Sequence, residues 1–96
     1  MFKKYVIERQ IAGIGGEPME ALCGIARRSN EVLDELGTDV QWLHSYIADD
    51  KTYCVYLARD KALIREHAVR AGFPADAIVE VLSVLDPTKA PGCPMR

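Results

Sequence analysis

The chain has 96 residues, of which 49% are hydrophobic and 27% charged, and its formal net charge at pH 7 is −2. This length and composition are typical of one soluble globular domain with a thin core. The net charge is slightly negative, and the sequence has no basic stripe that could neutralise phosphates. We therefore expect no nucleic-acid partner. No apolar run reaches the ~20 residues of a membrane-spanning helix, so we expect no membrane partner either.

The start of the chain and its cysteines indicate a cytoplasmic protein. A strand is expected from Lys3 onward, which leaves no room for a signal peptide. The cysteines Cys23, Cys54 and Cys93 are odd in number and widely spaced, so they form neither a disulfide framework nor a CxxC metal knuckle. Cys93 lies in the tail, where we expect it to be exposed and oxidisable.

The first half of the chain predicts one strand and one helix. Lys3–Gln10 has a β-branched and aromatic centre, as strands do. Pro18 suits the first turn of a helix, and apolar residues then recur at three- and four-residue steps as far as Leu36. Gly37 is the expected stop.

The second half predicts a hairpin, a helix and a last strand. Residues 40–48 and 52–58 read as two strands joined around residues 49–51. Asp60 caps a helix that Gly72 ends. Residues 77–85 form the last strand, and the chain then becomes rich in proline and glycine.

The order β-α-β-β-α-β predicts an α+β, ferredoxin-like domain over residues 1–87, with a flexible tail at 88–96. This topology places both helices on one face of a four-stranded antiparallel sheet. We expect the other face, which carries many apolar residues, to be covered by a second copy, giving a homodimer.

The alternation of side chains along the strands predicts which residues share the helix-free face. A hairpin turn on Asp50 and Lys51 pairs Ile47 with Cys54, whereas a three-residue turn would mix the two rows. With the first turn, the helix-free face carries two carboxylates, one imidazole and three aromatic side chains: Glu8, Glu80, His44, Trp42, Tyr46 and Tyr53.

An imidazole and two carboxylates are suitable ligands for a divalent transition metal such as nickel. Glu8, His44 and Glu80 are therefore the candidate metal ligands. In the alternative interpretation the carboxylates are solvated or paired with Lys4 and Arg9, and His44 is a hydrogen-bonded interface residue.

The second helix offers a further candidate pair. His67 lies on its apolar side next to Glu66, and these two side chains are an alternative metal site. A single histidine on an apolar helix face is more often a hydrogen-bonded core residue.

Three segments carry a family resemblance: VIERQIAG, VQWLHSYIADDKTYCVYLA and IREHAVRAGFPADAIVEV. Together they resemble, over residues 4–86, a family of small bacterial ferredoxin-like proteins that was long labelled a domain of unknown function and has nickel-binding members. The resemblance implies a homodimer and nickel or a similar divalent ion. It implies no particular reaction, and the ligand assignment rests on strand alternation alone.

Two other functions remain open, because the chain contains no complete catalytic signature. The first is a small dimeric enzyme of the oxygenase or isomerase type, with Trp42, Tyr46 and Tyr53 lining a pocket on the sheet face and His44 as acid or base. The second is a metal-free module that binds a small ligand in the same pocket.

Overall fold

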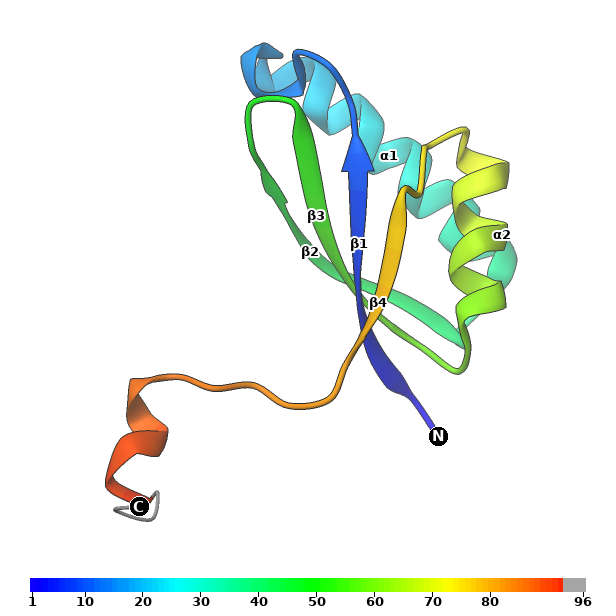
Figure 1. Cartoon of the computed structure of the whole chain (residues 1–96). Coiled ribbons are helices and arrows are strands. Elements are labelled where there is room, and N and C mark those ends of the chain that lie inside the picture. The colour runs from blue at the N-terminus through cyan, green and yellow to red at the C-terminus, as the bar shows by residue number, and fades with distance from the viewer. Residues whose placement is uncertain (93–96) are drawn as a thin grey trace.

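The computed structural model describes residues 1–92 and confirms the predicted fold. Four antiparallel strands form one sheet in the order β2-β3-β1-β4, and both helices lie on one face of it (Figure 1). This connectivity is ferredoxin-like. The elements in chain order are β1 (Lys3–Gln10), the 3-10 helix η1 (Ile14–Gly16), α1 (Met19–Leu36), β2 (Val40–Ile47), β3 (Lys51–Ala58), α2 (Lys61–Ala71), β4 (Ala77–Val81) and the 3-10 helix η2 (Pro87–Gly92).

The local signals that predicted the helices operate as expected. Pro18 stands directly before the first residue of α1, and Gly37 follows its last residue. The Asp60 carboxylate accepts a hydrogen bond from the Leu63 N–H at 3.1 Å and so caps α2. Gly72 ends α2 with a φ of 78°, a backbone conformation that favours glycine. Within residues 1–92, neither helix is long and apolar enough to cross a membrane.

The core lies between the helices and one face of the sheet. Every second side chain of β1 is buried there, and the row includes the charged residue Arg9. Because strand side chains alternate, the residues between them face the helix-free side. The buried apolar cluster consists of Tyr5, Ile7, Val40, Cys54, Tyr56, Ala58 and Ile64.

The β2–β3 hairpin turns on Asp49 and Asp50, since the Ala48 N–H donates to the Lys51 carbonyl at 2.8 Å. The predicted turn one residue later is therefore wrong. The resulting register pairs Ile47 with Thr52 rather than with Cys54. This difference of two residues keeps each of these side chains on its predicted face, because the period of a strand is also two.

A β-bulge in β2 changes the face of one aromatic residue. Trp42 pairs with Tyr56 and His44 with Val55, so Leu43 is an extra residue on the bulged strand. Trp42 consequently lies on the helix side with Tyr56, and its predicted place on the helix-free face is wrong. The prediction for His44 is confirmed, because its partner Val55 lies on the helix-free side.

The last strand also differs from its prediction. Glu80 pairs with Tyr5 and Ile78 with Ile7, so both belong to the helix side, and the predicted placement of Glu80 beside Glu8 is wrong. Strand β4 has apolar residues in both rows, so its own alternation could not fix its faces. It ends at Val81, opposite Lys4, and not at residue 85; β1 begins at Lys3, so it offers no partner to residues 83–85.

Residues 82–86 form an extended arm that leaves the body of the domain and leads to η2 (Figure 1). The arm carries apolar side chains in an exposed state: Leu82 is 88% exposed and Leu85 is 84% exposed. The sheet thus ends at β4, and the domain end predicted at residue 87 stays a prediction. The end of the predicted tail, with Cys93, lies outside the described residues.

Gly15 allows η1 to pack against the hairpin. Its N–H donates to the Asp49 carbonyl at 2.9 Å, and a Cβ at this position would lie 2.6 Å from the Ala48 oxygen and 2.8 Å from the Asp49 Cα. Gly15→Ala should therefore displace η1 from the turn and lower the free energy of unfolding by about 1–3 kcal/mol in urea denaturation.

The matched control is Gly24→Ala in α1, where an added Cβ meets no atom within 4 Å. This change should raise the free energy of unfolding by about 0.5–1 kcal/mol, because alanine loses less backbone entropy than glycine in a helix. Equal effects of the two substitutions would contradict the contact assigned to Gly15.

Candidate functional site

The helix-free face carries a row of polar and aromatic side chains across three strands. Tyr46 pairs with Tyr53, and Tyr53 pairs with Glu8. Tyr46 is 62% exposed and Tyr53 is 36% exposed. His44 lies in the next row on β2, opposite Val55. The structure therefore brings His44, Tyr46, Tyr53 and Glu8 onto one open surface, as the sequence predicted.

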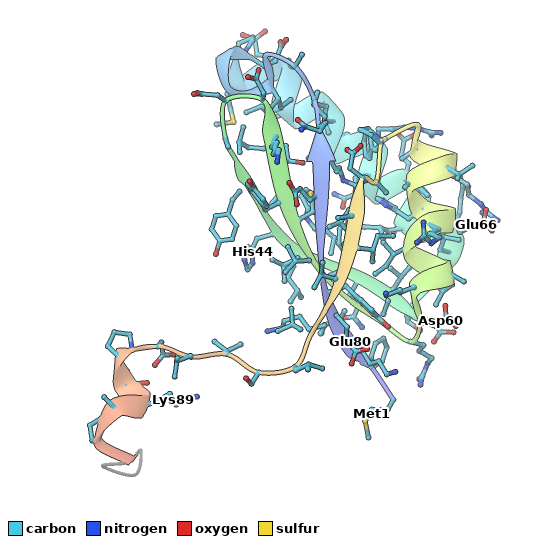
Figure 2. All side chains as sticks on the ribbon, in the orientation of Figure 1. Met1, His44, Asp60, Glu66, Glu80 and Lys89 are labelled. Atoms are coloured by element: carbon cyan, nitrogen blue, oxygen red, sulfur yellow. The ribbon has the colours of Figure 1, made fainter. Side chains whose placement is uncertain are left out.

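The His44 imidazole is accessible on this surface. Its ring meets the Tyr46 ring edge-on, with 5.1 Å between the ring centroids. Within residues 1–92 it has neither a hydrogen bond nor an ion pair. Figure 2 shows His44 on the side of the sheet away from the helices. Its ring nitrogens are thus available to a ligand outside the chain.

Glu8 is engaged in an ion pair on the same face. Its Oε1 accepts a hydrogen bond from the Lys51 ammonium at 2.5 Å. This hydrogen bond, together with the charge of Glu8, raises the pKa of Lys51 above its ordinary value. A cation that recruits Glu8 has to compete with Lys51 for the carboxylate.

Glu80 does not join this group. It lies on the opposite face and makes an ion pair with Lys3 at 3.9 Å, and Figure 2 places it near the N-terminal end of the chain. His44 lies on β2 and Glu8 on β1, with β3 between them, and the two residues are one row of side chains apart along the strands. At standard sheet spacings their Cα atoms are about 12 Å apart. No group of three metal-ligating side chains forms anywhere in residues 1–92. Glu8, His44 and Glu80 of one copy therefore do not lie together as one group of ligands.

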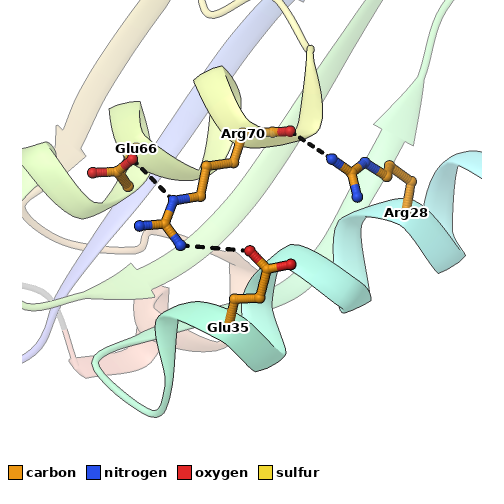
Figure 3. A network of polar contacts seen from close by, with 4 residues as sticks. All are labelled: Arg28, Glu35, Glu66 and Arg70. Atoms are coloured by element: carbon orange, nitrogen blue, oxygen red, sulfur yellow. Dashed lines mark hydrogen bonds and ion pairs between the residues drawn. The ribbon is translucent and has the colours of Figure 1, made fainter.

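The alternative pair of Glu66 and His67 is also divided. Glu66 is exposed and accepts a hydrogen bond from Arg70 at 3.0 Å, and Arg70 reaches Glu35 of α1 at 3.5 Å (Figure 3). Arg28 of α1 donates to the Arg70 carbonyl at 2.7 Å. These contacts join the two helices at their solvent side, a structural role for Glu66.

His67 points the other way, into the core, where it is fully buried. Its Nε2 lies 3.1 Å from the Ser29 hydroxyl, and its Nδ1 has no hydrogen-bond partner in the described part of the chain. Burial, followed by the positive charge of Arg9, lowers the pKa of His67 to about 4. His67 is thus a neutral core residue at pH 7, and it forms no site with Glu66.

A cavity of about 350 Å³ lies on the helix side, bounded by α1, β2 and β3. Trp42 lines it, whereas Tyr46 and Tyr53 do not, so this cavity is different from the pocket predicted on the sheet face. The polar side chains that line the cavity are Arg9, Ser29, Trp42, Ser45, Thr52 and Tyr56.

Arg9 is the site residue that sequence reasoning missed. It is 2% exposed, and its guanidinium donates to the Pro74 carbonyl at 2.5 Å and to the Tyr56 hydroxyl at 3.4 Å. Its Cζ lies 5.6 Å from the centre of the Phe73 ring. The signal was present in the sequence, because Arg9 falls in the same strand row as Tyr5 and Ile7, which are core residues.

The burial of His67 should make stability depend on pH. As pH falls from about 6.5 to about 4, the unfolded chain binds a proton at this histidine and the folded chain does not, so stability is lost with falling pH. The loss should be on the order of 3 kcal/mol. Urea unfolding of His67→Gln should show a weaker pH dependence than wild type over this interval, with Arg9 and Tyr56 unchanged beside the site. Parallel pH curves for the two proteins would refute the assignment.

Comparison with known proteins places the chain in a family. The family model described as "Nickel responsive protein SCO4226-like" matches residues 5–81. The crystal structure of SCO4226 from Streptomyces coelicolor A3(2) is similar with a TM-score of 0.68 at 22% identity, over 85% of this chain and 99% of that one. At this identity the crystal structure supports the fold alone. No curated protein sequence matches the chain significantly. The resemblance seen in the sequence is confirmed, and the chain belongs to the SCO4226-like family of nickel-responsive proteins.

Proposed function

We propose that this protein binds nickel, or a similar divalent transition metal, between two copies of the chain at the helix-free face. The observation that carries the proposal is the exposed His44 imidazole, which has no hydrogen bond or ion pair within the described chain, in a member of a nickel-responsive family. The proposed role is binding, and it includes no reaction. The free thiols of Cys23 and Cys54 suit a reducing, cytoplasmic setting.

The donor set explains why two copies are needed. One copy offers one imidazole, His44, and one carboxylate, Glu8, on the same face but about 12 Å apart. Nickel binds imidazole nitrogen and carboxylate oxygen in shells that take several such donors. A two-fold axis through this face would double the donors, and it would let His44 of one copy approach Glu8 of the other.

The apolar surface of the chain supports a second copy as the partner. Tyr46, Tyr53 and Val79 are exposed on the helix-free face, and Val79 is 57% exposed. The arm of residues 82–86 leads away from its own domain (Figure 1), and its Leu82 and Leu85 are exposed. A sheet face and an arm that both expose apolar side chains would cover each other in a homodimer.

The metal site is tested by nickel titration calorimetry on three variants. His44→Ala should lower the affinity at least about tenfold, since even indirect partners of a metal commonly contribute 10–100-fold. Lys51→Met should raise the affinity, because it frees Glu8 from its ion pair. Glu80→Gln is the control, because Glu80 lies on the opposite face. The nickel affinity of this variant should equal that of wild type.

Two outcomes would contradict this assignment. A wild-type nickel affinity of the His44→Ala variant would show that the His44 imidazole is not a ligand. A weaker site in Glu80→Gln, with an unchanged one in Lys51→Met, would place the ion on the helix side of β4 instead.

The dimer is tested by sedimentation at micromolar concentration with two truncations. Removal of residues 88–96 should leave both dimerisation and melting temperature nearly unchanged, because the described part of this tail buries no side chain. Removal of residues 82–96, which takes away the apolar arm as well, should weaken dimerisation. A monomeric full-length chain, or equal dimerisation of the two truncated chains, would count against the proposed interface.

A further inference from the structure

We propose that the cavity between α1 and the sheet is a binding site for a small organic acid, with one carboxylate held by Arg9 and an apolar body enclosed by the walls. This site lies on the helix side of the sheet, so it is separate from the proposed metal site and does not depend on it.

The first argument is the unbalanced charge of Arg9. An arginine that is only 2% exposed normally has a carboxylate partner, because desolvation of a charge is costly. Here its partners in residues 1–92 are neutral: the Pro74 carbonyl, the Tyr56 hydroxyl and the Phe73 ring. No acidic side chain in residues 1–92 makes an ion pair with Arg9. A positive charge therefore borders the cavity with no anion to neutralise it.

The second argument is the chemistry of the groups beside Arg9. Burial raises the pKa of Tyr56 above its ordinary value, so its hydroxyl keeps its proton at pH 7. His67 is neutral, and the less costly tautomer donates Nε2–H to Ser29 and leaves the Nδ1 lone pair unpartnered. The Ser29 hydroxyl then donates to the Tyr56 oxygen, which leaves the Tyr56 hydroxyl hydrogen for an outside acceptor. Arg9 and Tyr56 thus present donors and no competing negative charge.

The third argument is the shape and the walls of the cavity. Its volume of about 350 Å³ falls at the lower end of the range for small-molecule sites. Apart from Arg9 no lining residue is charged, and Ile14, Leu22 and Ile47 contribute apolar surface. Walls of this kind exclude a hydrated inorganic anion and favour an apolar body. The single positive charge of Arg9 among apolar walls matches a ligand with one carboxylate.

Entry to the cavity lies between α1 and the edge strand β2. Met19 and Cys23 of α1 are exposed and line the cavity, as does the exposed Ile47 of β2. Strand β2 is at the end of the sheet, so no further strand closes this side. A ligand can therefore reach Arg9 without unfolding of the core.

The experiment compares straight-chain carboxylates of six to ten carbons with the primary alcohols of the same lengths, using the full chain. Binding is followed by calorimetry and by the fluorescence of Trp42, which is the single tryptophan of the chain and lines the cavity. At pH 7 a carboxylate should bind at least tenfold more tightly than its matched alcohol. Equal affinities, or no binding of either, would overturn the proposal.

Two variants locate the site. Arg9→Met keeps a long apolar side chain and removes the charge, so the preference for carboxylate over alcohol should fall to about one. Ala26→Phe leaves Arg9 in place and fills the cavity from α1, so it should abolish the binding of both ligands. This second variant keeps the test decisive if Arg9→Met does not fold. His44→Ala, on the opposite face, should bind carboxylate as wild type does. Unchanged binding in Ala26→Phe would overturn the assignment.

Discussion

The two-residue period of the sheet is the constraint on which both candidate sites depend, and the bulge at Leu43 is where that period is interrupted. In a regular strand Trp42 and His44 would share one face, because they are two residues apart. With the bulge, Trp42 donates from its indole N–H to Ser45 at 2.9 Å and forms part of the cavity wall. His44 remains on the open face. One inserted residue thus places Trp42 in the cavity wall and His44 on the open face of the sheet.

The same period separates two adjacent charges on β1. Glu8 lies on the open face and pairs with Lys51, while Arg9 lies in the core without an acidic partner in the described chain. Because they point to opposite sides of the sheet, Glu8 and Arg9 do not neutralise each other, as one interpretation of the sequence supposed. Lys51 takes the place of Arg9 as the partner of Glu8. A charge is left over on the helix side, and the cavity adjoins it.

The family is described as nickel-responsive, and within residues 1–92 no three metal-ligating side chains come together, which is why the proposed site uses two copies. The described chain offers dispersed donors on an apolar surface, together with an apolar arm that its own domain does not cover. The cavity under α1 has its donors and its apolar walls within one copy. The two proposed sites therefore differ in what each would take from outside the chain: a second copy for one, and a small anion for the other.

The sequence by itself determined the order of elements, the helix ends at Gly37 and Gly72, and the open-face placement of Glu8, His44, Tyr46 and Tyr53. These follow from local signals: caps, turn residues and hydrophobic period. Only the tertiary structure decided the faces of Trp42 and Glu80 and the depth of Arg9 and His67. A bulge is a property of two paired strands, and β4 is apolar in both rows. The row of Arg9 could be read from β1 alone, but its burial without a carboxylate depends on which residues α1, α2 and β3 bring to it.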